Sequence, residues 1–236
     1  KRMKQAGIDT VSVSVDGLEN THDTLRGKIG SWQACFKAIK FLRNVGITVG
    51  VNTQINRNTA SELALLYQRL VDEKVQAWQI QLTVPMGNAV DNAQILLQPI
   101  ELLDLYPVLY YLSLRSRKDG LTIQPGNNIG YFGPYERTLR GANHLESEWA
   151  FYKGCRAGID TIGIEADGKI KGCPSLPSDV YTGGNIREKR LSDIFHNSEQ
   201  LSINKASSLI ESTEHLWGHC ASCEFASTCR GGCHWT

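Results

Sequence analysis

Four cysteines close together near the end of the sequence are the residues whose type and spacing most clearly indicate chemistry. Cys220, Cys223, Cys229 and Cys233 follow the pattern C-x2-C-x5-C-x3-C. Neither the period of a helix nor that of a strand explains this spacing. Four thiols within so short a segment indicate metal ligands or disulfides.

The other three cysteines are of two kinds. Cys155 and Cys173 flank the dipeptide Asp167-Gly168, a strong signal for a two-residue turn, so we expect a β-hairpin that brings both thiols to one end. Cys35 lies on the apolar face of an expected helix, where cysteine packs as a small hydrophobe.

Three uses of the six clustered cysteines stay open at this point. A disulfide framework is typical of small secreted domains, and we expect no signal peptide for this chain. A structural zinc site could add His219 or His234, but such sites usually pair two C-x2-C motifs and only one is present. Iron–sulfur clusters use thiolates at uneven spacings. We favour iron–sulfur ligation.

The composition is that of a soluble globular protein. The 236 residues are 41% hydrophobic and 21% charged, with a formal net charge of +1. This charge gives no electrostatic case for a nucleic-acid or anionic-membrane partner, and we expect no apolar run of the roughly 20 residues that span a bilayer. The sequence lacks an initiator Met and stops just after the cysteines, so we interpret it as an internal fragment of a longer protein.

The first part of the chain alternates strands with helices. Residues 8–16, 47–55 and 78–84 have the β-branched or alternating pattern of strands. We expect a polar loop over residues 18–30, a helix capped by Ser31, and a capping box made by Thr59 and Glu62. This order predicts βαβ units in a parallel sheet, with functional side chains at the carboxyl ends of the strands.

From Pro99 onward, the sequence no longer shows the regular alternation of strands and helices. A helix is expected from Pro99 to about Arg117, then a strand over residues 121–124 and an ordered loop over 125–150. Beyond the hairpin we expect a turn at residues 183–185 and a short helix over 190–196.

The spacing of six cysteines and one glycine resembles the SPASM domain of radical S-adenosylmethionine (SAM) enzymes. The family pattern is C-x(9–15)-G-x4-C, a gap, C-x2-C-x5-C-x3-C, and a seventh cysteine after a further gap. Cys155, Gly168, Cys173 and the quartet match it in order. The resemblance covers residues 154–236 closely and 8–100 more loosely.

The resemblance implies ligands for two auxiliary [4Fe–4S] clusters. Carried over, auxiliary cluster I takes Cys155, Cys173 and Cys233. Auxiliary cluster II takes the first three cysteines of the quartet, which are Cys220, Cys223 and Cys229. Its fourth ligand is the seventh cysteine of the pattern, which is expected beyond Thr236.

The upstream half resembles the same family in a shorter motif. The segment S-V-D-G at residues 14–17 is similar to the S-x-D-G that ends a strand of the radical SAM barrel, which implies that Ser14 and Asp16 lie near the SAM ribose. Arg26 of the following H-D-x2-R-G and Gly87 are further candidate SAM contacts. The alternative for His22 and Arg26 is an exposed loop held by local salt bridges.

Three differences from the family pattern limit which residue roles can be assigned to this sequence by resemblance. The C-x3-C-x2-C loop of the SAM-cleaving cluster is absent and is expected before residue 1. Cluster I has only three clear cysteines, and Asp160 is the one other potential ligand nearby. Pro174 stands where sulfatase-maturing relatives carry an Asp, so that base is not indicated.

We therefore predict an α/β protein: part of a (β/α)6 radical SAM barrel over residues 1–124, the connecting loop 125–150, and a truncated SPASM domain over 151–236. The resemblance implies a peptide maturase that uses a 5′-deoxyadenosyl radical, SAM and [4Fe–4S] clusters, inactive as this fragment alone. Implied partners are a peptide or small protein and a reductant such as flavodoxin or ferredoxin, in the cytoplasm. The alternative is a non-enzymatic iron–sulfur or zinc module for electron transfer or interaction.

Overall fold

The computed structural model describes residues 2–126, 129, 133–141, 155–202 and 212–233. It divides into two compact units, Lys1–Phe151 and Tyr152–Thr236. Within the predicted connecting loop over residues 125–150, residues 127–128, 130–132 and 142–150 lie outside the described residues.

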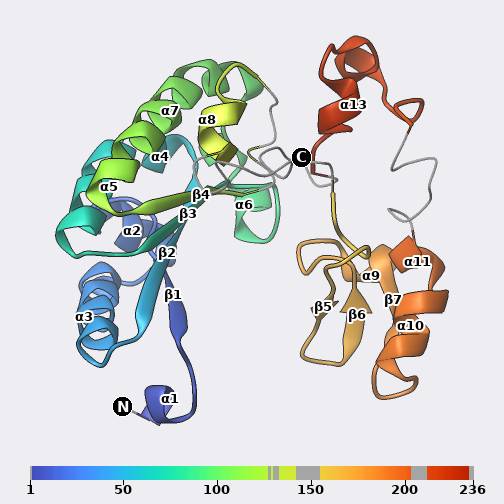
Figure 1. Ribbon diagram of the computed structural model, residues 1–236, viewed down its shortest axis with the longest axis horizontal. Helices are drawn as coiled ribbons and strands as arrows, with labels where there is room; N and C mark the ends of the chain where they lie inside the picture. Colours follow the sequence, from blue (N-terminus) through green and yellow to red (C-terminus); the bar gives the residue numbers. More distant parts are fainter. Residues whose placement is uncertain (1, 127–128, 130–132, 142–154, 203–211, 234–236) are drawn as a thin grey trace. The chain divides into compact units, whose positions relative to one another are not determined.

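Unit 1 is built on a parallel sheet in which the strands follow one another in sequence order (Figure 1). Each strand pairs with the next along the chain, as βαβ units require. The prediction of an α/β unit on a parallel sheet is therefore confirmed. The strands are β1 (Thr10–Ser14), β2 (Thr48–Ile55), β3 (Ala77–Leu82) and β4 (Thr122–Pro125).

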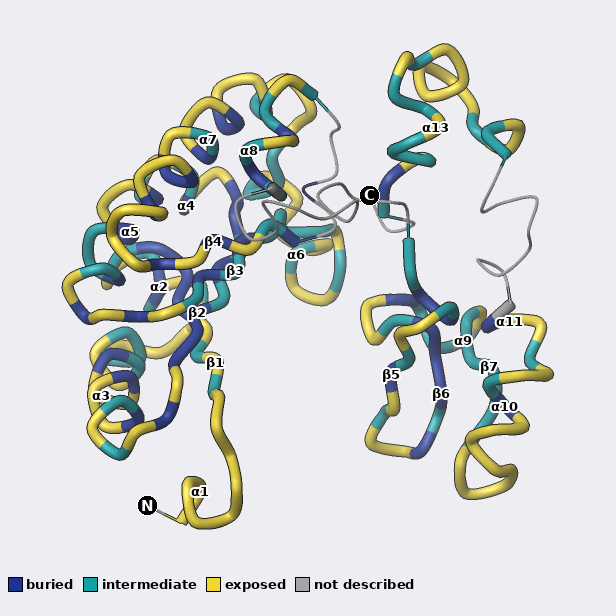
Figure 2. The backbone as a smooth tube through the Cα atoms, viewed as in Figure 1, coloured by how far each residue is buried: buried dark blue, intermediate teal, exposed yellow. Residues whose placement is uncertain are grey.

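Three long helices supply the core of unit 1 from one face of this sheet. They are α3 (Ser31–Asn44), α5 (Leu63–Asp72) and α7 (Leu102–Asp119). Buried side chains recur every three or four residues along each helix and pack against buried strand residues such as Val51 and Trp78 (Figure 2). A fully buried aliphatic or aromatic side chain contributes roughly 1.5–3 kcal/mol. Because this core covers one face of the sheet, the strand side chains that alternate with the buried ones lie on the opposite face.

The predicted loop over residues 18–30 contains a helix, α2 (Glu19–Arg26). Its first turn is stabilised by a distant carboxylate: the Leu18 backbone N–H donates to Glu62 Oε2 at 2.7 Å, and the Thr21 hydroxyl donates to Glu62 Oε1 at 2.7 Å. Gly27 ends the helix in the left-handed conformation. The loop prediction was wrong because this cap comes from a residue far along the chain.

Both predicted helix caps were wrong as well. Asp23, not Ser31, satisfies the start of α3, because its carboxylate accepts from the backbone N–H groups of Gly30 and Trp32. The capping box belongs to Asn56 with Thr59, at the start of α4 (Arg57–Ala60). Glu62 is therefore available to cap α2.

Short helices complete unit 1: α1 (Arg2–Gln5), α6 (Asn88–Asp91), η1 (Ala93–Ile95), η2 (Pro99–Glu101) and α8 (Glu136–Gly141). The last of these lies inside the predicted connecting loop. By length and composition alone, the helical stretch Ala93–Asp119 could cross a membrane, which the sequence analysis did not anticipate. Leu105, Leu109 and Leu112 of this stretch belong to the core of unit 1.

Unit 2 contains a small antiparallel sheet of β5 (Gly163–Ile164), β6 (Lys169–Lys171) and β7 (Thr182–Asn185). Its buried apolar cluster consists of Ile170, Ile194 and Leu201. Helices α9 (Ser178–Tyr181), α10 (Leu191–Asn197) and α11 (Glu199–Ser202) follow the sheet or interrupt it. The predicted turn at residues 183–185 is thus a strand, and the short predicted helix is confirmed as α10.

The β-hairpin of unit 2 is confirmed, but its turn is longer than predicted. The Glu165 N–H donates to the Lys169 carbonyl, and the Gly168 N–H donates to the Glu165 carbonyl, which leaves three residues in the loop. Gly168 has φ +89°, and a Cβ on it would lie 2.6 Å from Asn185 Oδ1. Gly168 therefore closes a three-residue loop, for which a left-handed residue is typical, and a side chain at this position would strain the backbone and displace Asn185 Oδ1.

Candidate functional site

The face of the sheet in unit 1 that lies opposite the three long helices, here called the open face, is lined with neutral polar side chains. The strand register places Ser14, Asn52, Gln79 and Gln124 in one row across all four strands. These side chains are exposed or half-buried, whereas the residues between them along β2 and β3 are buried on the other face. Parallel sheets usually have both faces covered by apolar packing. A polar row in this position therefore indicates a binding surface.

Gln54 and Gln81 form the next row toward the carboxyl ends of β2 and β3. Functional side chains were expected at the carboxyl ends of the strands in general, but the glutamines of β3 were not singled out from the sequence. The signal was present in the alternation W-Q-I-Q-L over residues 78–82, where every second residue is an amide.

Asp16 is the centre of a hydrogen-bonded group at the carboxyl end of β1. Its Oδ2 lies 2.5 Å from a terminal guanidinium nitrogen of Arg26, and its Oδ1 accepts the Gln54 backbone N–H at 2.8 Å. The Asp16 side chain is only 6% exposed, and that of Arg26 is 41% exposed. Arg26 therefore presents donors to solvent beside an anchored carboxylate. The structure brings these two predicted residues together.

His22 fixes the backbone of Asp16. The Asp16 N–H donates to His22 Nδ1 at 3.0 Å, so the neutral imidazole carries its proton on Nε2. His22 is 1% exposed. Burial lowers the pKa of His22, with an opposing effect of Asp16 and a smaller lowering by Arg26. His22 is therefore a neutral, buried histidine in α2, and the alternative that placed it in an exposed loop was wrong.

Cys35 is half-buried beside this group. Its Sγ lies 3.9 Å from His22 Nε2 and donates to the Ser14 carbonyl at 3.5 Å. Burial raises the pKa of the Cys35 thiol, which keeps it protonated. The interpretation of Cys35 as a packing residue agrees with this environment.

Ser14 and Gly87 are placed by other features of unit 1. The Ser14 side chain belongs to the polar row of the open face. Gly87, which precedes α6, has φ +53° and is exposed. Whether these two residues contact SAM stays a prediction, as it does for Asp16 and Arg26.

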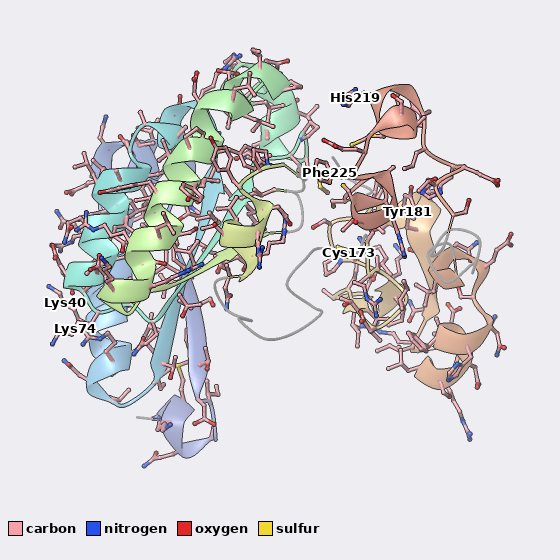
Figure 3. All side chains as sticks on the ribbon, turned by 45° about the horizontal axis from the view of Figure 1, so that its top comes forward. Lys40, Lys74, Cys173, Tyr181, His219 and Phe225 are labelled. Atoms are coloured by element: carbon pink, nitrogen blue, oxygen red, sulfur yellow. The ribbon has the colours of Figure 1, made fainter. Side chains whose placement is uncertain are left out.

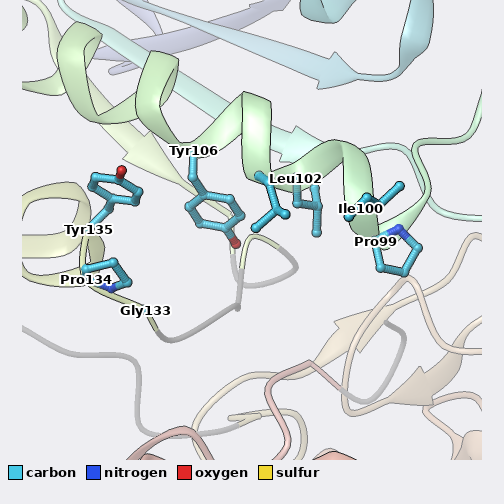
Figure 4. Close-up of a pocket in the computed structure, with 8 residues that line it drawn as sticks. Pro99, Ile100, Leu102, Tyr106, Gly133, Pro134 and Tyr135 are labelled. Atoms are coloured by element: carbon cyan, nitrogen blue, oxygen red, sulfur yellow. The ribbon is translucent and has the colours of Figure 1, made fainter.

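An apolar cavity of about 500 Å³ lies in unit 1 between the start of α7 and the segment before α8 (Figure 4). Leu102 and Tyr106 project into it from α7, and Pro134 and Tyr135 line another side. This cavity could not be predicted from the sequence, because its lining comes from two segments that are distant along the chain.

In unit 2, close backbone packing brings the segments of Cys155 and Cys173 together. A Cβ on Gly172 would lie 2.8 Å from the Gly158 nitrogen and 3.1 Å from the Ala157 Cβ. Gly172 directly precedes Cys173, and Ala157 follows Cys155 by two residues. Cys173 is half-buried just beyond the end of β6 (Figure 3).

The cysteine quartet is carried on two tight turns. Cys220 lies in η3 (Gly218–Ser222), and the Cys223 N–H donates to its carbonyl at 3.4 Å. Cys229 ends α13 (Ala226–Cys229). The three residues between Cys229 and Cys233 all have positive φ, at 53°, 78° and 72°. This explains the sequence R-G-G, because two of the three positions have the glycine that a left-handed backbone favours.

The donor set fits iron–sulfur ligation. Six thiols lie on short turns, and none of the seven cysteines, all of which are described, is in a disulfide. Among the described residues, no group of three or more His, Cys, Asp or Glu side chains could hold a single metal ion. A four-iron cluster spaces its ligands further apart, because each thiolate binds a different iron atom. The two predicted ligand sets stay predictions.

Comparison with known proteins supports these features. Residues 155–224 match the SPASM iron–sulfur cluster-binding domain. The chain is 27% identical over 256 residues to the AdoMet-dependent heme synthase of Oleidesulfovibrio alaskensis, covering 98% of this chain and 58% of that protein. The chain thus spans about three fifths of the length of this curated relative.

Two solved structures have the same fold. AnSMEcpe with bound AdoMet superposes with a TM-score of 0.69 at 16% identity, over 97% of this chain and 59% of that one. Streptococcus suis SuiB bound to S-adenosylmethionine gives 0.65 at 19% identity, over 95% and 49%, and SuiB has also been solved with its precursor peptide SuiA.

The cysteine turns of unit 2 agree with the match of residues 155–224 to the SPASM iron–sulfur cluster-binding domain. Over nearly its whole length the chain is similar in sequence to an AdoMet-dependent heme synthase and in fold to two proteins solved with bound S-adenosylmethionine.

Proposed function

We propose that the intact protein is a peptide maturase that modifies a ribosomally made peptide or small protein. The observation that carries this proposal is the row of neutral side chains Ser14, Asn52, Gln79 and Gln124 on the open face of the sheet. Amides and hydroxyls both donate and accept hydrogen bonds, as peptide groups do. No Lys, Arg or His lies in this row, so it suits an amide-rich substrate better than a polyanionic one.

The cofactors would be held by both units. In unit 2, Cys155, Cys173 and Cys233 would hold one auxiliary cluster, and Cys220, Cys223 and Cys229 the other. In unit 1, the SAM contacts would be Ser14, Asp16, Arg26 and Gly87. When bound, SAM and a reduced cluster supply a 5′-deoxyadenosyl radical that abstracts hydrogen.

The residues of this chain would bind and orient. Arg26, anchored by Asp16, has guanidinium N–H groups that face solvent and could donate to ligand oxygens. His22 and the Gln54 N–H hold Asp16 in place before any ligand arrives. A group held in advance loses little entropy on binding.

The roles of the regions follow the same proposal. Residues 1–124 would form the later part of the radical SAM barrel, 125–150 the connection, and 151–236 the auxiliary-cluster domain. The protein would work in the cytoplasm, where flavodoxin or ferredoxin supplies electrons.

A second candidate substrate is a haem-related tetrapyrrole. The specific observation in its favour is the 27% identity to a heme synthase over nearly the whole chain. The apolar cavity beside Tyr106 and Tyr135 could accept part of a macrocycle.

The test uses the intact protein, reconstituted anaerobically with iron and sulfide. It is supplied with SAM, a reductant and either iron–coproporphyrin III or a candidate precursor peptide, chosen from any short reading frame that adjoins the gene. We expect 5′-deoxyadenosine and a mass change in the peptide. A mass change confined to the porphyrin overturns the peptide proposal in favour of the second candidate.

A variant locates the peptide site. Replacement of one neutral hydrogen-bonding group costs about 0.5–1.5 kcal/mol, so Gln79→Leu should raise the KM for the peptide by roughly 2- to 10-fold. The control is Gln33→Leu on the exposed side of α3, which should leave KM unchanged. Equal KM values for the two variants would contradict a role of the polar row.

A further inference from the structure

Lys171 is a buried lysine whose charge the sequence analysis did not consider. The residue is 2% exposed. Lysine is almost never fully buried unless it is paired, because removing an ammonium group from water is costly. An explanation is therefore required for a lysine two residues before a predicted cluster ligand.

The ammonium group of Lys171 is surrounded by acceptors. It donates to the carbonyls of Pro174 at 3.1 Å and Leu176 at 2.5 Å, and to the Ser178 hydroxyl at 3.2 Å. Glu165 of the facing hairpin strand supplies the opposite charge as an ion pair. The Ser178 hydroxyl in turn donates to Glu165 Oε2 at 2.9 Å, which closes the group.

Three of these four acceptors belong to the segment that leaves Cys173. Lys171 thus ties residues 174, 176 and 178 back to the end of β6, and the Leu176 N–H donates to the Cys173 carbonyl at 3.1 Å. The chain cannot straighten after Cys173 without exposing the ammonium group or leaving it buried without partners, and the second state is strongly unfavourable.

The backbone on both sides of Cys173 is held as tightly. Gly172 packs against Ala157 and Gly158 of the Cys155 segment. A Cβ on Gly163 would lie 2.8 Å from the Pro174 Cγ, so the facing strand touches the residue after Cys173. Lys171 and Gly172 directly precede Cys173, and the contacts of these two residues fix the position of the same short turn.

We propose that Lys171 is a positioning residue for Cys173, holding that thiol in place for its iron–sulfur cluster. The inference rests on the proposed ligand set, in which Cys173 binds auxiliary cluster I. Lys171 touches neither substrate nor iron. It acts through the loop of residues 174–178.

The test compares Lys171→Met with Cys173→Ala in the intact, reconstituted protein. The readouts are the rate of iron loss to a chelator and the EPR signal of the reduced auxiliary clusters. Removal of a residue that orients a metal ligand typically costs 10- to 100-fold in metal affinity. We expect Lys171→Met to accelerate iron loss about 10-fold or more and to alter the EPR signal that Cys173→Ala abolishes, with the signal of the other auxiliary cluster unchanged.

Two further variants separate this role from a general loss of folding. Lys171→Arg keeps the charge and should restore much of the wild-type signal. Lys169→Met removes a lysine of the same strand whose side chain is 42% exposed and pairs with Asp167 at the turn, and it should behave as wild type. If Lys171→Met does not fold, Ser178→Ala, which leaves no buried charge unpaired, should give a smaller acceleration of iron loss.

The outcomes distinguish the assignment of Cys173 as a cluster ligand from the positioning role of Lys171. If Cys173→Ala keeps both auxiliary clusters, the ligand assignment fails. If Cys173→Ala loses a cluster while Lys171→Met or Ser178→Ala releases iron at the rate of Lys169→Met, the assignment stands and the role of Lys171 is refuted.

Discussion

The two units hold their candidate functional residues by different means. In unit 1 the polar row and the Asp16 group lie on a sheet backed by a continuous apolar core that draws on three long helices. In unit 2 the buried apolar cluster comprises Ile170, Ile194 and Leu201, and the cysteines lie on turns fixed by glycines and one buried lysine. The site of unit 1 is therefore formed in advance by packing, whereas unit 2 depends more on what its cysteines bind.

Cluster removal should give the largest difference between the units. Metal binding and folding are coupled in small metal-binding domains, so chelation of iron from the intact protein should raise amide hydrogen exchange in β5, β6 and β7 toward unfolded rates. Exchange in β1 to β4 should change little. Cys223→Ala should reproduce part of this loss and Cys35→Ala none of it, and equal protection of unit 2 with and without iron would contradict the comparison.

Truncation of the core should destabilise unit 1 by the next largest amount. Leu66 is fully buried and its neighbour Leu65 is 61% exposed. Leu66→Ala should lower the free energy of unfolding by roughly 2–5 kcal/mol, whereas Leu65→Ala should stay within about 0.5 kcal/mol. Urea unfolding followed by circular dichroism measures both, and similar midpoints for the two variants would show that packing does not hold unit 1 as described.

Loss of the Asp16 charge should affect binding more than folding. Asp16→Asn keeps the shape of the side chain but weakens its contacts with Arg26 and the Gln54 N–H. Hydrogen bonds to charged groups are worth about 1.5–3 kcal/mol, so SAM affinity of the intact protein should fall roughly 10-fold or more by calorimetry. Asp9→Asn, at the exposed carboxylate paired with Lys4, should leave the affinity unchanged. An unchanged affinity in Asp16→Asn would remove Asp16 from the proposed SAM site.

Replacement of His22 should have the smallest effect and should also test which ring nitrogen accepts the hydrogen bond from the Asp16 N–H. Asparagine places an oxygen near the position of Nδ1 and should preserve the hydrogen bond from the Asp16 N–H, whereas glutamine places it near Nε2. His22→Gln should therefore cost about 1 kcal/mol relative to His22→Asn. Thermal unfolding at neutral pH measures the difference, and a less stable His22→Asn would contradict the assigned tautomer.

The pH dependence of the wild type has a defined sign. Burial lowers the pKa of His22 below its ordinary 6.5, so the unfolded chain takes up the proton first as the pH falls. Stability should be lost as the pH falls from about 6.5 toward the lower pKa of the folded state. Asp16, Asp23 and Arg26 are the charged groups that act on the imidazole. The pH slope should diminish in His22→Asn, and an identical slope would assign it to other groups.

The sequence predicted the features that depend on local pattern. Hydrophobic periodicity gave the parallel α/β order of unit 1, and the Asp-Gly dipeptide gave the hairpin of unit 2. The errors occurred where a distant residue determines the local structure. Helix α2 begins where Glu62 accepts the Leu18 N–H and the Thr21 hydroxyl. The Gly-Gly sequence in β7 is typical of a turn, but Ser198 and Leu201 pack closely against the backbone of Gly183, which lies in a strand.

The candidate functional residues could be predicted from the sequence to about the same extent as the fold. The spacing of the cysteines indicated their chemistry, because ligand spacing is a local property. The row that joins Ser14 to Gln124 depends on the register between strands, which no single segment encodes. The acceptors around Lys171 are carbonyl groups, whose direction cannot be inferred from residue types.

Glu62 reaches the start of α2 only because Gly17 has no side chain there. A Cβ on Gly17 would collide with Glu62 Oε2, and Gly17 itself has φ +79°. The two positions are therefore expected to change together in evolution: a chain that gains a side chain at position 17 should lose the carboxylate at position 62 and recruit another cap for α2. Covariation between positions 17 and 62 would mark members of the family that keep Asp16 and His22 in the arrangement seen here.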